Sequence, residues 1–540
     1  MGLKMLRKIQ IGEEATKGTA VAATAALLGG LTMKESPTIH RPVEERATLA
    51  EFSRSIKVAN LAELTFEGDA TFEQILYPLH MGVLGSVSPP DANPISVEHD
   101  DNTIPLDLAN TYDGVPATSE TILAFTVAED YICIRSATKF NAVRVDIGAT
   151  PNAVASVISA IECLDGATNW VACTSVVDGT ESPAGTSMAI DGVITFVPNA
   201  LWGIDTFDAV DGYWIRISWS VDWTASTIIN DFYVESLDRT WTFTPTMTAA
   251  GTFDSFTIEY GGDVEQWETE FCLARRVEIS GAMNEPLRMR SEIFGRKMSV
   301  CNFTTAITPP TVESILTQKG RLYIDAETGT IGTTEKSATL IGFTYTINTG
   351  LGFKRYADGS IDFSNYSETV KGVDLRMTFA FNAGAETERL FFDGETLRLI
   401  RMIFDGSEAQ NTDSTDSVVD APLTADALTV EVNVPGNFSI GEIIKMQDEY
   451  CLITNIVAND LTITRGYNGS TPAEHIATTP IYIIQFKQLT LDFCGIYTDW
   501  ATLSEREGED IVEVTMSTQR GTTYTTLFQQ TVVNNVRVLP

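Results

Sequence analysis

The hydrophobic and polar positions along this chain alternate mainly with the period of β-strands. Runs in which every second residue is apolar recur throughout, as at Ala62–Glu67 and Val512–Met516, and Gly, Asp and Asn residues separate them. Apolar residues recur at three- and four-residue spacing in two places, Thr71–Met81 and Glu395–Phe404, and each is expected to form a helix. The pattern therefore predicts a mainly β chain with few short helices.

The first predicted helix has signals at both ends. Thr71 and Gln74 have the spacing of a capping box, in which the hydroxyl and the amide satisfy free N–H groups at a helix start. Pro78 is expected to kink or shorten the far end, because proline cannot donate a helical hydrogen bond.

The two predicted helices lie in similar surroundings, which predicts a tandem duplication. In each case an alternating strand precedes the helix, and two further strands follow much later in the chain. The strands of the first copy are Leu64–Glu67, Arg276–Ser280 and Leu287–Met298, and those of the second are Leu375–Phe379, Gln488–Asp492 and Ile511–Met516. The seam is expected near Thr308–Pro310.

Each copy is interrupted by a segment of different composition. The first follows the proline-rich Ser88–Pro90, continues as short strands with regular turns, and predicts a β-sandwich. The second opens with the polar stretch Asn411–Ser417, which is typical of a linker. The predicted domains are a first core β-domain (1–88 and 238–308), an inserted sandwich (89–237), a second core β-domain (309–410 and 485–540) and a small inserted β module (411–484).

The net charge of −36 changes the functional picture. Affinity for nucleic acid or for an anionic membrane needs clustered Lys and Arg, so both binding classes are disfavoured. Most of the net negative charge lies in the interruptions, with 21 acidic against 4 basic residues over 91–237 and 10 against 2 over 411–484. The seven scattered cysteines, without a CxxC pair, favour reduced thiols made in a cytosol. No stretch has the length of a membrane span or the pattern of a signal peptide.

Reactive side chains are not arranged as in an enzyme. The four histidines have no HxxxH or HxH partner, and neither glycine-rich stretch forms a phosphate loop. Asp205, Asp208 and Asp211 come closest to a calcium loop, but solvated turn acids are the commoner cause. Trp214 and Trp219 could stack on sugars, although their alternating strand favours core packing. We therefore expect no catalytic, cofactor-binding or metal-binding residues.

The N-terminal residues resemble a known family. Ile11–Thr24 contains the pattern G-x-E-x-x-x-G-T-A-x-A-A, which is similar to the opening of siphophage-type major tail (tail tube) proteins. The resemblance continues through Ala62–Gly82 and Val277–Met298 and returns in the second copy. The first interruption looks like a galactose-binding-like or jelly-roll sandwich. The second, with His475 after its glycine turn, looks like a small β module that decorates phage virion proteins.

The resemblance implies a structural virion protein that self-assembles into stacked rings. Such tubes resemble rings of six core domains, so a chain with two should form a homotrimer with pseudo-sixfold symmetry, with a hexamer as the alternative. The implied partners are the tape measure, tail terminator and distal tail proteins, while genomic DNA passes through the lumen unbound. The implied location is the virion tail, assembled in the host cytoplasm, and not a membrane.

The interface residues are expected near the N-terminus. Thr32–His40 and Arg41–Lys57 should supply a long hairpin or loop for contacts between rings. Its candidate interface charges are Glu44, Glu45, Arg46 and Arg54, although an ordinary solvated loop would look the same. Both acidic interruptions are expected to project outward, because a sandwich of this size would block the bore.

Other classes remain open at this level. A multidomain carbohydrate-binding or adhesin-type protein would use the aromatic residues of the first interruption. A baseplate or distal tail protein would share the virion setting. A β-sandwich glycosidase is disfavoured, since no convincing pair of catalytic carboxylates appears.

Overall fold

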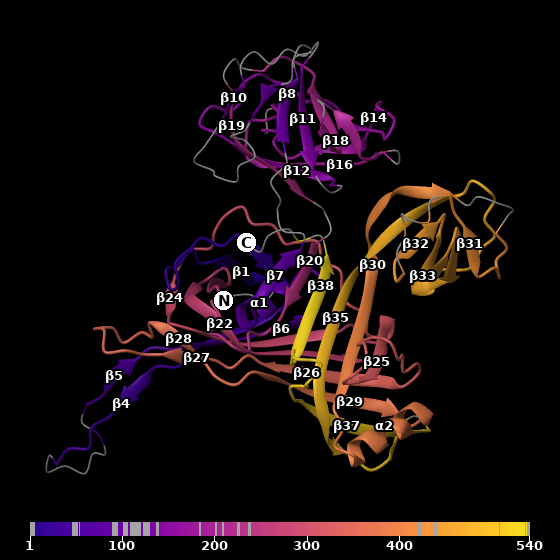
Figure 1. Ribbon diagram of the computed structural model, residues 1–540. Coiled ribbons are helices and arrows are strands. Elements are labelled where there is room, and N and C mark those ends of the chain that lie inside the picture. Colours follow the sequence, from indigo (N-terminus) through magenta and orange to yellow (C-terminus); the bar gives the residue numbers. More distant parts are fainter. Residues whose placement is uncertain are drawn as a thin grey trace. The chain divides into compact units, whose positions relative to one another are not determined.

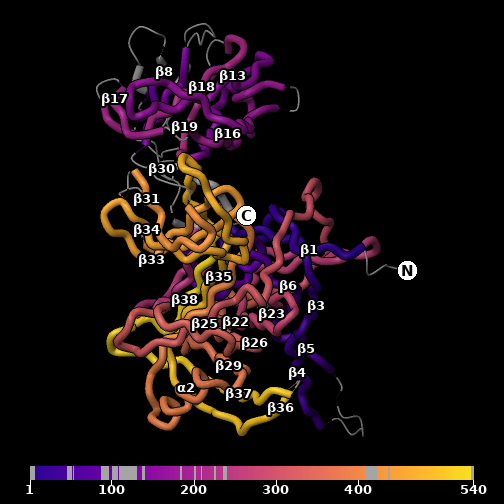
Figure 2. The backbone as a smooth tube through the Cα atoms, turned by 90° about the vertical axis from the view of Figure 1, so that its right-hand side faces the viewer, coloured from indigo at the N-terminus to yellow at the C-terminus, as the bar shows by residue number. Residues whose placement is uncertain are grey.

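A computed structural model gives the fold of the chain, shown as a ribbon in Figure 1 and as a tube in Figure 2. Strands make up most of its regular structure, and the described residues contain two α-helices, so the chain is mainly β, as its alternation predicts. The structure describes residues 6–45, 52, 54–88, 96–100, 106–108, 120–122, 130–136, 140–182, 185–199, 202–207, 210–223, 227–235, 239–417, 423–433, 435, 438, 440–506, 508–534 and 536.

The chain divides into two compact units. Unit 1 consists of Met1–Ser88, Thr240–Ser407 and Phe486–Pro540. Unit 2 consists of Pro89–Arg239 and Glu408–Gln485. The two copies expected from the sequence therefore lie together in unit 1, and the domain boundaries within it stay predictions.

The first part of unit 1, called the first repeat below, is an antiparallel sheet. Its strands are β1 (Lys8–Glu13), β2 (Ala25–Leu27), β3 (Gly30–Glu35), β6 (Ala62–Asp69), β21 (Phe256–Gly261), β22 (Gln266–Ala282), β23 (Arg288–Gly295) and β24 (Met298–Val300). The order across the sheet is β3–β6–β23–β22–β21–β1. The short strand β2 pairs with β1, and β24 pairs with β22 beside β23.

The second repeat has the same order of strands. Its strands are β25 (Gly320–Ala326), β26 (Leu340–Asn348), β29 (Gly372–Ala380), β30 (Arg398–Ser417), β35 (Pro480–Trp500), β36 (Ser504–Arg506), β37 (Glu509–Thr518) and β38 (Phe528–Asn534). The order is β26–β29–β37–β35–β30–β25, and β38 pairs with β35 as β24 pairs with β22. Chain order and pairing order therefore agree, strand for strand, between the two repeats.

One hydrophobic core serves both repeats. Alternate residues of equivalent strands point into it, such as Leu64 and Phe66 of β6 and Leu375 and Met377 of β29, and all four are buried. Two further strands, β7 (Gly85–Ser88) and β20 (Arg239–Phe243), pair with each other, and β20 also pairs with β38. Because the two repeats share one core, they form one compact unit and not two.

The helices differ in part from the prediction. The first helix, α1 (Leu76–Gly82), overlaps the second half of the predicted range and ends one residue beyond it, and the residues from Thr71 form turns before it. Pro78 is the third residue of α1 and lies in its first turn, where a backbone N–H has no partner within the helix. It therefore fits the start of the helix and does not kink it. The second helix, α2 (Ala383–Asp393), ends before the range Glu395–Phe404 that was predicted to be helical.

The predicted helix at Glu395–Phe404 is wrong, because β30 begins there. Ile400, Met402 and Phe404 are all buried, which is the two-residue period of a strand. Over so short a run the apolar positions fit the period of a helix and that of a strand equally. Gly394 caps the end of α2, and it is the sequence signal that the helix stops before Glu395.

Residues Pro89–Arg239 of unit 2 form a β-sandwich. Its strands are β8 (Ser96–Asp100), β9 (Leu106–Asp107), β10 (Glu120–Ile122), β11 (Tyr131–Ser136), β12 (Ala142–Ile147), β13 (Ile158–Leu164), β14 (Trp170–Ala172), β15 (Thr174–Asp178), β16 (Gly192–Val197), β17 (Asp205–Phe207), β18 (Val210–Trp219) and β19 (Thr227–Glu235). One sheet has the order β10–β19–β12–β16–β15 and the other β14–β13–β18–β11–β8–β9, with β17 paired to β18. Trp214 and Trp219 are buried, which confirms the packing interpretation of these residues.

The rest of unit 2 contains a smaller β module with its own core. Its strands are β31 (Thr429–Glu431), β32 (Ile443–Met446), β33 (Glu449–Val457) and β34 (Asp460–Thr464). They pair antiparallel in the order β31–β34–β33–β32, around apolar residues such as Val430, Ile444, Ile453 and Ile463.

Candidate functional site

The segments that lead into the helices of the two repeats share a side-chain cap, which lies on a turn before α1 and directly at the start of α2. The hydroxyl of Thr71 accepts a hydrogen bond from the N–H of Gln74 at 3.1 Å, before α1. The side chain of Asn382 accepts one from the N–H of Ala385, also at 3.1 Å, at the start of α2. The spacing is three residues in both cases, so Thr71 and Asn382 are equivalent positions.

The long strands share a second landmark. A β-bulge at Arg275 interrupts the pairing of β22 with β23, and a bulge at Thr498 interrupts the pairing of β35 with β37. Matching the strands through these landmarks gives residue-by-residue equivalence. The equivalent pairs include Arg276 and Asp499, Glu278 and Ala501, Ile279 and Thr502, Ser280 and Leu503, Thr32 and Thr344, Met33 and Tyr345, Lys34 and Thr346, and Ser36 and Asn348. The same match pairs Leu273 with Ile496 and Phe294 with Ser517, and counting from Thr71 and Asn382 pairs Tyr77 with Glu388.

Inside the chain, the repeats are joined by direct pairing of β22 with β26. The pairing begins with Arg276 opposite Asn348 and continues to the end of β22. The N–H of Thr349 donates to the carbonyl of Arg275 at 3.2 Å, just before this ladder. Hydrogen-bonded and non-bonded pairs alternate in an antiparallel ladder, so odd-numbered residues of β22, such as Ile279, bond to β26.

The strand equivalent to β26 in the first repeat is β3, and its outer edge is open. The register pairs of β3 in the described structure are all with β6. Ser36 donates its N–H to the carbonyl of Leu61 at 2.7 Å, so the even-numbered residues of β3 bond toward β6. Met33 and Glu35 therefore direct their N–H and C=O groups away from the sheet.

The segment equivalent to the paired half of β22 lies at the end of β35, and it is also open. Ala501–Leu503 belong to no strand, and Thr502 and Leu503 are exposed. The N–H of Ala501 donates to the carbonyl of Glu513 in β37 at 2.9 Å, so Thr502 directs its backbone groups the other way. Within the described residues, no register pair lies on that edge from Asp499 to Leu503.

Each repeat also carries a two-stranded arm after its edge strand. The first arm consists of β4 (Thr38–His40) and β5 (Ile56–Ala59), and the second consists of β27 (Leu351–Lys354) and β28 (Asn365–Glu368). Both are antiparallel hairpins, and the first projects beyond the sheet in both views (Figures 1 and 2). The second arm lies against the first repeat, with Phe363 at its tip completely buried.

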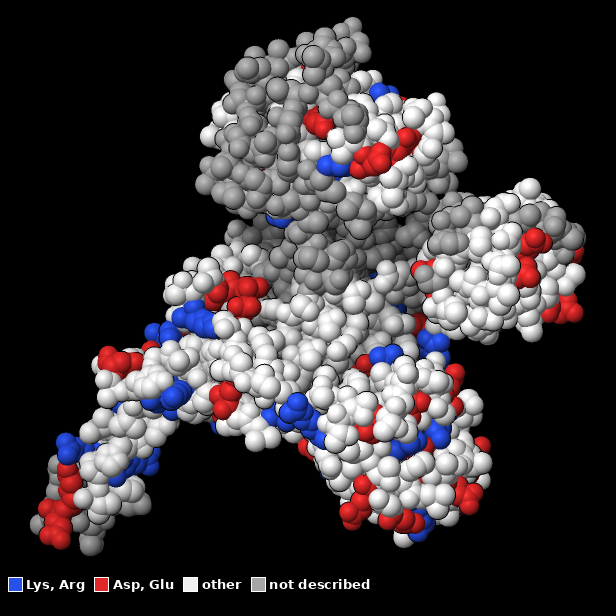
Figure 3. Space-filling model, in the orientation of Figure 1, with Lys and Arg blue, Asp and Glu red and all other residues white. Residues whose placement is uncertain are grey.

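The structure places the predicted interface charges on the first arm. Glu44 and Arg54 form an ion pair with 2.6 Å between Oε1 and Nη2, and Glu45 is exposed. Arg46 lies outside the described residues. The space-filling view shows acidic and basic side chains along the arm (Figure 3). The structure brings Glu44 and Arg54 together, and the role of the predicted charges between rings stays a prediction.

The solvent-facing side of the joined sheet is polar along both repeats. Arg290 lies 3.3 Å from Glu67, and Arg276 lies 3.0 Å from Glu278 and 3.7 Å from Glu292. By strand register, the charged residues of this face are Lys34, Arg276, Arg288, Arg290 and Arg376, with Glu63, Glu67, Asp69, Glu278, Glu292, Asp374, Asp499 and Glu513. Acidic residues outnumber basic ones, and several arginines are already paired.

One group of side chains in unit 1 has the composition of a cation site. Glu13, His80 and Asp254 place their ligand atoms within 4.8 Å of one another. A hydrogen bond from His80 lowers the pKa of Asp254, whereas burial and then the charge of Asp254 raise the pKa of Glu13. An imidazole and two carboxylates could hold a divalent cation. The pairing of His80 with Asp254 at 3.3 Å also accounts for the group without one.

The aspartates that come closest to a calcium loop in the sequence make ordinary turn contacts in the sandwich. The N–H of Thr168 and that of Thr206 both donate to the carboxylate of Asp205. The hydroxyl of Thr206 donates to Asp211, and Asp208 lies outside the described residues. The two described aspartates therefore stabilise the turns around β17.

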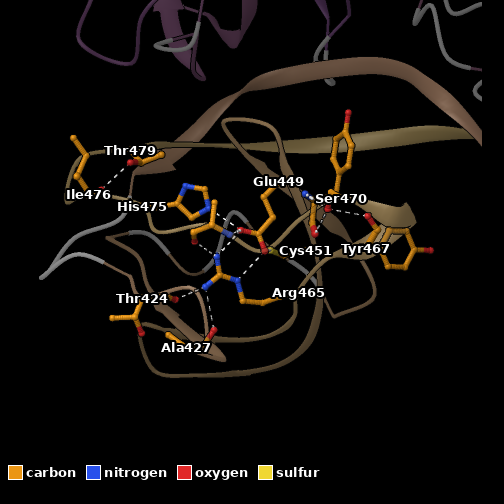
Figure 4. Close-up of polar contacts among 12 residues, drawn as sticks. Thr424, Ala427, Glu449, Cys451, Arg465, Tyr467, Ser470, His475, Ile476 and Thr479 are labelled. Carbon is orange, nitrogen blue, oxygen red and sulfur yellow. Dashed lines mark hydrogen bonds and ion pairs between the residues drawn. The ribbon is translucent and has the colours of Figure 1, made fainter.

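A buried ion-pair network crosses the core of the small module (Figure 4). Arg465 donates from Nε to Glu449 at 2.8 Å and also contacts the second carboxylate oxygen, and His475 Nε2 lies 2.8 Å from it. Burial alone would raise the pKa of Glu449, but hydrogen bonds from Arg465, the N–H of Ala473 and His475 outweigh it and lower that pKa to about 2. The carboxylate therefore stabilises the module at neutral pH, and this contribution is lost as the pH falls through about 2. The network holds the module together, and all its charged groups face one another.

The thiols do not form a reactive site. All seven cysteines are free. Burial raises the pKa of Cys451 to about 12 and that of Cys494 to about 11, so both stay protonated at neutral pH.

The described helices include none that is both long and apolar enough to cross a membrane.

Sequence reasoning found the first arm but missed the open edges beside it. The signal for them was the similarity of Gly30–Ser36 to Gly342–Asn348, in which Gly and Thr recur at the same positions. Neither the models of protein families nor the curated proteins include a match to this chain.

Proposed function

We propose that this chain is a structural protein of a tailed bacteriophage that self-assembles into stacked rings and so builds the tail tube. The observation that carries the proposal is the doubled sheet of unit 1, whose inner junction is paired and whose two equivalent outer edges are open. Open edges expose unpaired N–H and C=O groups and promote pairing with another chain. The N-terminal resemblance to tail tube proteins favours the same function.

The two edges are different surfaces, which favours head-to-tail association. A chain offers one β3 edge and one β35 edge, so each copy can bind two neighbours in a heterologous manner. If the rotation closes, all the β3 and β35 edges are paired and growth within the ring stops. With two repeats in each chain, three chains supply six core domains, and a hexamer of chains is the alternative.

The polar face of the sheet suits the wall of a channel for DNA. Arg276 and Arg290 on this face are paired with carboxylates, and its acid excess repels phosphate, so DNA would pass without counterion-driven binding. On this proposal the sandwich and the small module project outward, where their negative charge would keep particles apart. Density for either inside the channel of an assembled tube would contradict this arrangement.

The proposal places the protein in the virion tail, assembled in the host cytoplasm with the tape measure, tail terminator and distal tail proteins. No catalytic residue, cofactor or membrane anchor is needed for this function. A carbohydrate-binding function is weaker, since Trp214 and Trp219 are buried in the sandwich and cannot stack on a sugar.

Mass photometry and negative-stain microscopy of the purified full-length chain test the proposal. We expect ring-shaped particles of three chains, and short hollow stacks as the concentration rises. A monomer at every concentration, with folding shown by circular dichroism, would refute self-assembly. Two unrelated topologies for the repeats in an experimental structure would remove its main argument.

A further inference from the structure

We infer that two copies of this chain join by pairing the outer edge of β3 with the segment Asp499–Leu503 of the next copy, in the register that β22 and β26 use inside the chain. The first arm of one copy then lies on the second repeat of its neighbour. The inference rests on the self-assembly proposed above and specifies the residues that meet at each junction.

The internal junction supplies the register. Inside the chain, Arg276 lies opposite Asn348, and Glu278 lies opposite Thr346. Replacing each residue by its equivalent places Asp499 opposite Ser36, Ala501 opposite Lys34 and Leu503 opposite Thr32. The register cannot be shifted, because both strands are matched independently. The bulges at Arg275 and Thr498 match β22 with β35, and the pairing of β3 with β6 and of β26 with β29 matches β3 with β26.

The residues that direct their backbone N–H and C=O groups outward on the two open edges agree with this register. Met33 and Glu35 direct their backbone groups outward from β3, and Trp500 and Thr502 direct theirs outward from the end of β35. The proposed register places Met33 opposite Thr502 and Glu35 opposite Trp500, so outward groups meet outward groups. A shift by one residue would place outward groups opposite inward ones and would also move every side chain to the other face.

The arms give an independent indication from apolar burial. In the second arm, Leu351 and Phe363 are buried against the first repeat, at 3% and 0% exposure. Ile39 lies opposite Lys57 as Leu351 lies opposite Glu368, and counting back five residues from Lys57 and from Glu368 matches Phe52 with Phe363. Ile39 and Phe52 are 48% and 37% exposed. A second two-stranded arm whose matching apolar residues are uncovered indicates a surface that is buried only when a second copy is present.

The neighbour's surface for this arm follows from the same equivalence. Inside the chain, the arm lies on Leu273 of β22 and Phe294 of β23. The corresponding positions in the second repeat are Ile496 of β35 and Ser517 of β37. Both are partly exposed in the isolated chain, so the site is accessible to an arriving arm.

Engineered disulfides test the register directly. The partly exposed native thiols are removed by Cys173→Ser and Cys301→Ser, and Lys34→Cys is combined with Ala501→Cys. These positions form a non-hydrogen-bonded pair, whose side chains are the closer kind in an antiparallel ladder and suit a disulfide. We expect mild oxidation to produce covalent dimers and trimers on non-reducing gels.

Two variants serve as controls. Glu278→Cys with Thr346→Cys sits at the equivalent internal pair and should form a disulfide within one chain, with loss of two free thiols. Lys34→Cys with Leu503→Cys is two residues out of register. Its cross-linked fraction should be at least about fivefold lower, because the diagonal distance of ~7–8 Å exceeds what a disulfide spans.

The outcomes separate this inference from the proposed function. Cross-linked trimers that depend on the Lys34 and Ala501 pair support both. Rings seen by mass photometry without this cross-link, while the internal control pair oxidises, overturn the register and leave self-assembly standing. Monomers throughout, with the internal control oxidised, overturn self-assembly and the inference with it.

Discussion

The two repeats of unit 1 have the same strands in the same order, but their surroundings differ. Each repeat has a half-strand that needs a partner and an arm that needs a surface. The half-strand of β22 and the arm of the second repeat find both inside the chain. The equivalent end of β35 and the arm of the first repeat find neither among the described residues. A duplicated sheet thus satisfies one junction internally and leaves the equivalent edges open, and the assembly proposed above rests on this difference.

The strongest test of this comparison places proline at equivalent positions of the closed and the open junction. Ile279→Pro removes a ladder hydrogen bond and a buried side chain from a central strand, and should destabilise unit 1 by on the order of 5 kcal/mol. Thr502→Pro removes only an outward N–H at an exposed site, so the free energy of unfolding should change by less than about 0.5 kcal/mol. Ring formation should nevertheless be lost.

Denaturant unfolding and mass photometry measure the two effects separately. Thr502→Val keeps the N–H and is the matched control, which should assemble like the parent chain. Normal rings from Thr502→Pro would show that this edge is not part of the junction.

The arms provide the second test. Phe363→Ala should cost about 4 kcal/mol, because the ring is completely buried among Phe271, Phe294 and Phe353. Phe52→Ala, at the equivalent position, should leave the unfolding free energy within about 1 kcal/mol of the parent. It should raise the concentration of half-assembly about tenfold, which corresponds to about 1.4 kcal/mol. Equal effects of the two changes on unfolding would contradict the different environments of the arms.

A third test uses a difference between the two repeats in the core that they share. Glu388 of α2 is buried with Arg398 at 2.8 Å and Lys336 at 2.9 Å, whereas the equivalent residue of α1 is Tyr77. Glu388→Ala leaves two buried cations without their partner and should cost about 3 kcal/mol. Tyr77→Phe should cost less than about 1 kcal/mol. Hydrogen exchange of unit 1 peptides reports both, and a small effect of Glu388→Ala would indicate that the cations reach solvent.

The sequence allowed more of the fold to be predicted than of the candidate site. Alternation identified strands such as β6 and β37 because one face of each is buried, and this fixes their period. It failed at Ile400–Phe404, where a short apolar run fits strand and helix equally. The charges of the first arm were recognised as polar residues in a long hairpin. The open edges were not recognised. Ile279 and Tyr345 pair with each other through their backbones, whereas the equivalent Thr502 and Met33 have no partner strand on their open edges among the described residues, and the sequence pattern does not show this difference.

The smallest expected effect concerns the capped segments before the helices, where the repeats should behave alike. Thr71→Ala removes the acceptor that caps the turn before α1, Asn382→Ala removes the acceptor that caps α2 itself, and each should cost about 1 kcal/mol. Thr71→Ser and Asn382→Asp retain the acceptor and should restore most of this loss in thermal unfolding. Because both positions lie away from the open edges, ring formation at saturating concentration should not change. A cap substitution that prevented assembly while the chain remained folded would mean that the junction extends to the helices, and the equivalence drawn from β22 and β26 would then describe only part of it.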